Sequence, residues 1–280
     1  MPSQVKNKLS SCGFVLTVLL FSPFARTQSA QTVPIPLPPM PADANPAFEV
    51  ATVKASDTSA PHGTFIRHNG RQIIAYNISV ARLIIYSYGL QAKQIADGPP
   101  SLLNTHFDID GVPDIEGHPN VSQTRMMFKK LLGSRFKLAF HYESRELPVY
   151  AIQIAKDGPK LTVSTARPGD STSFSYACPP VLTVRNYSMP DFAKGMQDGF
   201  LEKPVVDQTG LRDRYDFDLK WTPDDSASYC PVTPASSRND LDAPPGLYTA
   251  IQEQLGLKIV PTKAPVQVMV IDHIESPSAD

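Results

Sequence analysis

The stretch from Pro204 to Trp221 constrains the fold most strongly, because its pattern occurs twice in the chain. Its second part alternates apolar with charged residues, as a strand does when one face is buried and the other meets water. The same alternation occurs earlier, in Phe107-Asp108-Ile109-Asp110. We therefore expect two copies of one strand at equivalent places of a repeated fold.

Other landmarks recur in the same order around these strands. Asn77-Ile78-Ser79 and Asn186-Tyr187-Ser188 each end in a serine that can cap the helix that follows. Leu132-Gly133 and Leu255-Gly256 each close a later helix, since glycine commonly follows a helix C-terminus. This order predicts an α+β fold with an internal duplication, in which each half is a mainly antiparallel sheet with two helices.

The composition of the chain and its internal repeat predict where the domains begin and end. Residues 1–30 are predicted to be a signal peptide, and residues 31–47, which contain six prolines, a semi-stiff linker. The first α+β repeat is predicted at 48–162. The second is predicted at 163–280, with an inserted Pro/Ser/Asp-rich loop at 222–245.

The clearest single strand runs from Phe136 to Tyr142, where apolar and polar residues alternate. A second apolar run follows from Val149 to Ile154, and the segment Ser144-Arg145-Glu146 between them is polar. We therefore expect a β-hairpin with its turn at these polar residues.

The N-terminus has the three parts of an export signal. Lys6 and Lys8 are positively charged, the apolar run Gly13–Phe21 is short for a bilayer span, and small residues follow from Thr27 to Ala30. An uncleaved anchor and a buried helix are the alternatives. We expect an exported protein, periplasmic or secreted, with no membrane span after cleavage.

The net charge and the cysteines limit which partners and which cellular compartment the sequence is compatible with. The chain has 26 basic and 27 acidic residues, and it lacks the basic excess of a nucleic-acid binder. Of its three cysteines, Cys12 would leave with the signal peptide, so Cys178 and Cys230 would remain as a disulfide candidate in an oxidising compartment. Two unpaired thiols in proline-rich loops are the alternative.

The short motifs of common catalytic sites are absent from the sequence. It contains no His-Glu-x-x-His, Gly-x-Ser-x-Gly, Gly-x-x-x-x-Gly-Lys or Gly-x-Gly-x-x-Gly. None of the six histidines lies two to four residues from another, the spacing that places two metal ligands on one face. We therefore predict no catalytic, cofactor-binding or metal-binding residue.

Two carboxylate pairs, Asp108 with Asp110 and Asp216 with Asp218, each lie on one face of a predicted strand. Their Cα atoms should be about 7 Å apart, within the range of paired glycosidase carboxylates. The competing interpretation is that they are polar positions of half-buried strands, because catalytic carboxylates need two different environments.

The opposite face of the second strand is aromatic and aliphatic, and we expect it to belong to the core, with an exposed aromatic platform as the alternative. The residues of this face are Tyr215, Phe217, Leu219 and Trp221. The predicted binding surface consists of Trp221, Tyr215, Asp216 and Asp218.

Several short motifs stand at strand, cap and turn positions from about Phe48 to the C-terminus. They are Phe48–Lys54, Asn77–Ser79, Leu132–Phe136, Glu146–Tyr150, Pro204–Leu211 and Tyr215–Phe217. Together they resemble an uncharacterised secreted protein family that is expanded in soil bacteria. The resemblance implies a signal peptide and relatives fused to membrane-bound sensor metallopeptidases of the BlaR type. The family has no established activity or catalytic residues, so the resemblance assigns none to this chain.

Three hypotheses about function follow. The first is a non-catalytic extracytoplasmic module that binds a small ligand or an envelope protein, since a two-lobed molecule offers a cleft. The second is a secreted hydrolase of unfamiliar type that uses the strand carboxylates. The third is a structural envelope protein that self-associates through an exposed sheet edge.

Overall fold

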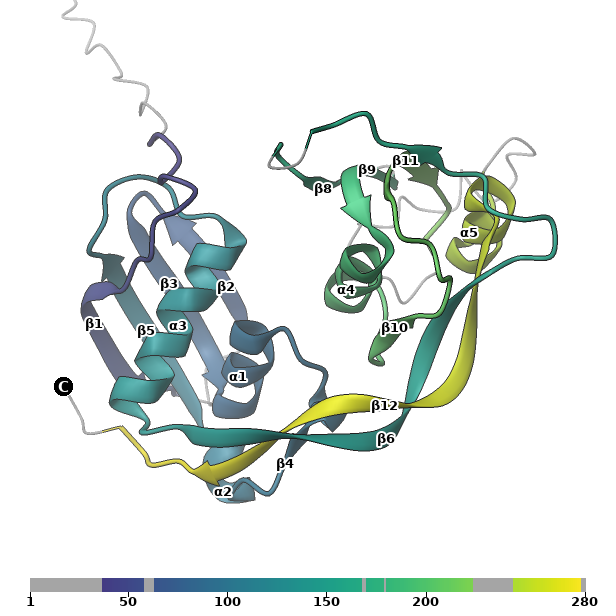
Figure 1. Ribbon diagram of the computed structural model, residues 1–280. Coiled ribbons are helices and arrows are strands. Elements are labelled where there is room, and N and C mark those ends of the chain that lie inside the picture. The colour runs from purple at the N-terminus through teal and green to yellow at the C-terminus, as the bar shows by residue number, and fades with distance from the viewer. Residues whose placement is uncertain (1–36, 58–62, 168–169, 179, 224–243, 278–280) are drawn as a thin grey trace, which may run out of the picture. The chain divides into compact units, whose positions relative to one another are not determined.

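The structure is a computed structural model that describes residues 37–57, 63–167, 170–178, 180–223 and 244–277. These residues form three four-stranded sheets and five α-helices (Figure 1). The predicted α+β class is therefore confirmed. Within the described residues, no helix has both the length and the hydropathy needed to cross a bilayer.

The first sheet is antiparallel throughout and carries two helices on one face (Figure 1). In spatial order its strands are β1 (Phe48–Ala55), β5 (His106–Pro113), β3 (Gln72–Ser79) and β2 (Phe65–Asn69). Its helices are α1 (Val80–Tyr88) and α3 (Val121–Arg135). Ile84, Ile109 and Phe128 are fully buried where sheet and helices meet. Between α1 and β5 lie η1 (Ala92–Gln94) and α2 (Pro100–Leu103).

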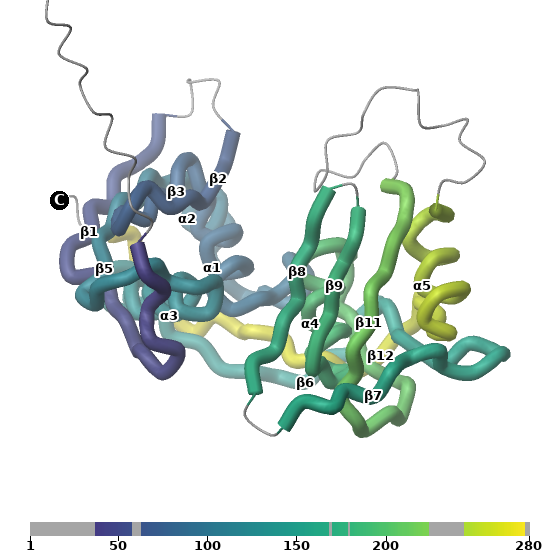
Figure 2. The backbone as a smooth tube through the Cα atoms, turned by 90° about the horizontal axis from the view of Figure 1, so that it is seen from above, coloured from purple at the N-terminus to yellow at the C-terminus, as the bar shows by residue number. Residues whose placement is uncertain are grey.

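A second antiparallel sheet has a core of its own. In spatial order its strands are β7 (Thr162–Val163), β11 (Arg214–Lys220), β9 (Val181–Ser188) and β8 (Ser173–Ala177). Its helices are α4 (Met189–Gly199) and α5 (Leu247–Leu255), of which α4 lies behind β8 and β9 in Figure 2. The apolar face of β11 is buried in this core, so the expectation that these side chains belong to the core is confirmed.

The third sheet is built on a ribbon of two long strands, β6 (Ala139–Ile154) and β12 (Leu257–His273), which run side by side in Figure 1. They pair antiparallel from Leu257 opposite Ile154 to His273 opposite Ala139. The short strands β10 (Val205–Asp207) and β4 (Ile95–Ala96) add in parallel, to β6 and to β12 respectively.

The predicted hairpin is therefore wrong. Ser144, Arg145 and Glu146 continue the strand, because each is paired with a residue of β12 instead of turning back. β10 and β4 meet only the two ends of the ribbon, so its middle consists of two edge strands. Edge strands tolerate proline, which explains why Pro148 and Pro265 do not end them.

Three of the four predicted helix caps occur in the structure. The Ser79 and Ser188 side chains accept hydrogen bonds from the third residues of α1 and α4, as expected. Gly256 ends α5 in the left-handed conformation, with φ of 64°, also as expected. Gly133 does not end α3, which continues to Arg135. Lys137 takes the left-handed position there, with φ of 53°, because Phe136 turns into the core.

One local arrangement occurs in both antiparallel sheets. Asn77 and Asn186, just before the capping serines, have φ of 48° and 57°. The backbone N–H of Asn77 donates to Asp108 Oδ1 at 2.8 Å, and that of Asn186 donates to Asp216 Oδ1 at 2.7 Å. The ladder is irregular at both sites, since a register shift accompanies each asparagine.

Part of the predicted linker lies within the described residues and packs against the first sheet's helices. Met40 is buried, and its N–H donates to His118 O at 3.0 Å. Gln123 at the start of α3 donates to Pro41 O at 2.7 Å. The ordered contacts therefore begin before Phe48, within the proline-rich segment.

Candidate functional site

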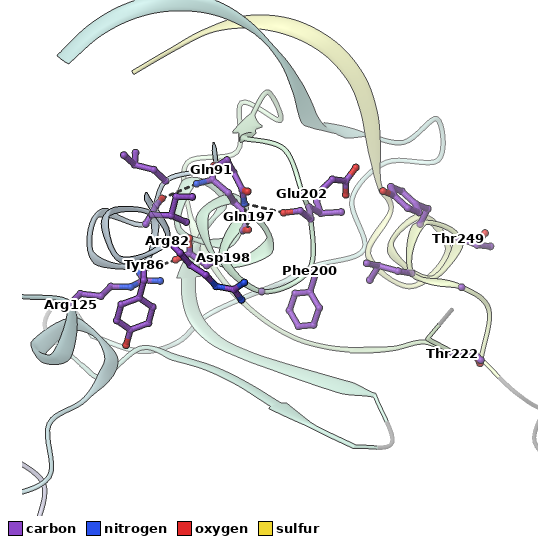
Figure 3. A pocket seen from close by; sticks show the side chains of 18 residues that line it. Arg82, Tyr86, Gln91, Arg125, Gln197, Asp198, Phe200, Glu202, Thr222 and Thr249 are labelled. Atoms are coloured by element: carbon purple, nitrogen blue, oxygen red, sulfur yellow. Dashed lines mark hydrogen bonds and ion pairs between the residues drawn. The ribbon is translucent and has the colours of Figure 1, made fainter. Parts of the chain in front are cut away.

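A cavity of about 870 Å³ lies among α1, α3, the turn after α4, and the start of α5. Figure 3 shows Arg82, Tyr86 and Arg125 on one side of it, and Thr222 and Thr249 on the opposite side. Its lining mixes charged, aromatic and aliphatic side chains from segments distant in sequence.

Two glutamines fix one wall of the cavity through backbone carbonyls. Gln91 Nε2 donates to Gln197 O at 2.7 Å and to Leu201 O at 3.1 Å. Gln197 is buried, and its Nε2 donates to Gly89 O at 3.0 Å while its Oε1 accepts from Val205 N at 3.1 Å. The Nε2 groups of the two glutamines thus hold the ends of α1 and α4 together, while Gln197 Oε1 ties α4 to β10.

A charged cluster lies beside this bridge. Asp198 on α4 pairs with Arg125 on α3 at 2.9 Å and with Lys194 one turn earlier on its own helix. Lys194 Nζ also donates to Gly89 O at 2.7 Å. Burial lowers the pKa of Lys194, and Asp198 opposes that shift.

Aromatic side chains supply much of the remaining lining. Arg125 lies over the ring of Tyr86 at 5.6 Å, and burial raises the pKa of that tyrosine. Phe200 packs edge-on against Trp221 at 5.3 Å, so the chain's one tryptophan lies behind the lining. Thr222, the next residue, lines the cavity itself.

A second aromatic group lies near the start of α5. Tyr150 Oη donates to Glu202 Oε1 at 2.8 Å, and this bond lowers the pKa of Glu202. Burial, followed by the hydrogen bond with Tyr150, raises the pKa of Tyr248 to about 12. Glu202 is therefore ionised and Tyr248 neutral near neutral pH.

Arg82 on α1 differs from the other charged groups. Its guanidinium group has no hydrogen-bond or ion-pair partner among the described residues, and Figure 3 shows it extending into the cavity. Across the cavity, the N-cap residue of α5 is Gly246, which has no side chain to cap the first amides. No acidic residue occupies that first turn.

The predicted binding surface is not assembled as a surface. Trp221 and Tyr215 are only 2% and 5% exposed, so their rings contact other core side chains. Asp216 is bonded to the Asn186 backbone, and Asp218 pairs with Arg185 at 2.9 Å. Of these residues, Asp218 is the exposed one.

The earlier carboxylate pair is engaged in the same way. Asp108 Oδ1 accepts from Ser56 Oγ at 2.7 Å as well as from the Asn77 backbone. Asp110 Oδ2 accepts from Gln72 Nε2 at 2.5 Å. These bonds join neighbouring strands, which favours the structural interpretation of both pairs.

The disulfide prediction falls partly outside the described residues. Cys178 follows β8 and is exposed, with its Sγ 3.5 Å from Tyr176 Oη. Cys230 lies in the segment 224–243, which the structure does not describe. The pairing therefore stays a prediction.

Histidines do not assemble a metal site in the described part of the chain, where no three His, Cys, Asp or Glu side chains form a group suited to a metal ion. His68 and His118 do stack, with ring centroids 4.7 Å apart. Burial, and then the neighbouring His118, lower the pKa of His68.

Sequence reasoning missed Arg82, Gln91 and Gln197. Arg82 reads as a solvent-facing residue of a helix, and the glutamines have no motif around them. The serine caps predict the helices that carry Arg82 and Gln197. No local sequence pattern predicts that the ends of these two helices lie side by side.

Fold and cavity together define an α+β protein in which two helix-bearing antiparallel sheets are joined by a long two-stranded ribbon. Residues 81–274 match the family described as "Protein of unknown function (DUF3738)". The chain belongs to this family. No curated protein and no solved structure matches the chain. The family description assigns no activity, so function has to be inferred from the cavity.

Proposed function

We propose that the protein is a non-catalytic extracytoplasmic module of the bacterial cell envelope, which binds a small ligand or a protein partner at the cavity. The observation that carries the proposal is the cavity itself. Its volume of about 870 Å³ falls in the range of sites for organic ligands, roughly 300–1,000 Å³. The hydrogen bonds of Gln91 and Gln197 hold its wall in place without a ligand, so little ordering would be required on binding.

The side chains of the cavity support binding better than catalysis. Nucleophilic catalysis needs a nucleophile beside a base, and among the described residues no histidine or cysteine lines the cavity. Of its two threonines, Thr222 donates its hydroxyl to Pro244 O and not to a base. Asp198 is held by two cations, and the lowered pKa of Glu202 makes it a poor general acid at neutral pH.

The extracytoplasmic location is supported by the charged and apolar segments of residues 1–30. Export also supports a disulfide between Cys178 and Cys230. Intact mass of the exported protein after alkylation without reductant tests both points. We expect a mass lacking the signal peptide and no alkylated thiol, whereas two alkylated thiols would exclude the bridge.

We infer further that the two helix-bearing sheets arose by duplication. The support is the recurrence of one detailed arrangement, a left-handed asparagine held by a strand aspartate and followed by a serine cap. Asparagine adopts this conformation more readily than most non-glycine residues, so it is the recurrence of the whole combination, with its aspartate acceptor and serine cap, that favours common descent over coincidence.

The binding proposal is tested by filling the cavity. Thr249 lines it from α5, whereas Gln252, exposed on the same helix, does not. Tagged wild-type protein, Thr249→Trp and Gln252→Trp are used to capture ligands and proteins from an envelope extract, with mass spectrometry as the readout. We expect species that wild type and Gln252→Trp retain and that Thr249→Trp loses by about tenfold or more. Equal recovery by all three proteins would overturn the proposal.

A further inference from the structure

The charged groups in and beside the cavity are unequally matched. Its two carboxylates are Asp198, held by Arg125 and Lys194, and Glu202, which has Lys203 as its neighbouring cation. Arg82 is then left over, because its guanidinium group has no counterion in the described part of the chain. Two cationic and two acidic side chains line the cavity, but Arg125, Lys194 and Lys203 already accompany both carboxylates, which leaves Arg82 as the unmatched charge.

Lys194, beside the cavity, lies among charges of both signs. Burial is the largest cause of its lowered pKa, and Asp198 raises that pKa whereas Arg125 and Lys129 lower it by repulsion. An anion entering the cavity would reduce this repulsion, whereas a cation would increase it. The preference for a negative ligand rests on Arg82, which lines the cavity and has no counterion among the described residues.

The guanidinium group of Arg82 has the right shape for such a ligand. Its planar set of N–H donors matches a carboxylate or phosphate and can bind two oxygens at once. It is accessible, because Arg82 is exposed and Figure 3 shows its side chain reaching away from α1 into the cavity. Binding would supply the counterion that the protein does not.

The apolar part of the lining indicates what the anion is attached to. Phe200 and Leu247 line the same space as Arg82, and Phe200 is supported from behind by Trp221. A bare inorganic ion would leave this surface uncovered. An organic body of aromatic or aliphatic character would bury it, at about 25 cal/mol per Å² removed from water.

We propose, as a refinement that rests on the binding function above, that the cavity takes an organic oxyanion, with Arg82 binding its carboxylate or phosphate group. Phe200 and Leu247 contact the apolar body of the ligand.

Three probes with one aromatic body test the proposal: 1-naphthylacetate, 1-naphthyl phosphate and the neutral 1-naphthylacetamide. Each is titrated into the mature protein at low salt, and the dissociation constant is measured by calorimetry, with backbone amide NMR shifts locating the site. We expect at least one anion to bind with Kd of about 1 mM or below, and the amide about tenfold more weakly. The two anions separate a carboxylate preference from a phosphate preference.

Arg82→Gln should reduce the affinity for the anions about tenfold, to that of the amide, and Arg82→Lys should lose less. Arg67→Gln is the matched control, since Arg67 is exposed on β2 and does not line the cavity. Thermal unfolding of each variant verifies that the fold is intact. Equal binding of acid and amide, no saturable binding of either anion, or indifference to Arg82→Gln would overturn the proposal. If a neutral ligand is still captured in a Thr249-dependent way, the binding function survives that failure.

Discussion

Asp216 and Asp218 lie two residues apart on β11, yet the structure predicts very different consequences for their removal. Asp216 accepts the backbone N–H of Asn186, which is 5% exposed and sits in the left-handed conformation. Asp218 pairs with Arg185 across the sheet surface, and both side chains are more than two-fifths exposed, at 47% and 43%. The two aspartates are therefore a matched pair of the same residue type on one strand.

The magnitudes follow from these contacts. Asp216→Ala leaves a buried amide without its charged acceptor, which costs about 1.5–3 kcal/mol of unfolding free energy. Asp216→Asn keeps an oxygen in place and should cost roughly 1 kcal/mol, the loss of charge assistance alone. Asp218→Ala removes an exposed ion pair and should cost about 0–1 kcal/mol.

Asn186 provides an independent test of the same arrangement. Asn186→Ala and Asn186→Gly both remove the side-chain bond to Asp170 O, so their difference reports on the backbone conformation. Alanine in a left-handed conformation costs about 1–2 kcal/mol, which glycine avoids. The glycine variant should therefore be the more stable by that amount.

Urea unfolding, followed by far-ultraviolet circular dichroism, measures these differences. Hydrogen exchange at the Asn186 amide and in the first turn of α4 then locates the effect. Equal stability of Asp216→Ala and Asp218→Ala would refute the structural role of Asp216. So would a hydrolytic activity of the wild type that Asp216→Asn abolishes with stability unchanged, since it would make the aspartate catalytic.

Two further predictions concern titration and packing. The pKa of His68 is lower in the folded protein than in the unfolded chain. As the pH falls below 6.5, the unfolded chain therefore binds a proton at His68 before the folded protein does, and the free energy of unfolding decreases. In an NMR titration, His68 should titrate below 6.5 and His141 above it, because hydrogen bonds to Glu143 and then Asp272 raise the pKa of His141. The reverse order would contradict the assigned environments. Gly256→Ala should destabilise by about 2 kcal/mol or more beyond Gly210→Ala, because both glycines have positive φ but an added Cβ meets backbone only at Gly256. Thermal and urea unfolding compare the two, and equal losses would show that backbone crowding at Gly256 is unimportant.

Local sequence patterns predicted the parts of the fold that depend on neighbours in the chain. The apolar faces of α1 and α3, the alternation of β11 and the serine caps all follow from periodicity and side-chain chemistry, and the structure has them. Gly133 shows the limit of such reasoning, because burial of Phe136 lets α3 run past a residue that usually ends helices.

The ribbon explains why the cavity could not be predicted from the sequence. A polar triplet between two apolar runs is typical of a hairpin, but here β12 supplies a partner for every residue of β6 and the triplet stays extended. The strand can then run from Phe140, which packs on the first core, to Ile152 in the second. β12 makes the same passage in reverse, with Leu257 in the second core and Met269 in the first.

The cavity depends on this passage. A hairpin would have kept both apolar runs of β6 in the same half of the protein. No continuous strand would then have connected the two cores and brought the ends of α1 and α4 together. Because the strands are continuous, each contributes side chains to both cores, and Gln91 can reach carbonyls more than a hundred residues away, at Gln197 and Leu201. The role proposed for Arg82 depends on the approach of these two helix ends. On an isolated helix it is a solvated cation like many others. Next to Asp198, which Arg125 and Lys194 already neutralise, it is the cation for which we propose that a ligand supplies the counterion.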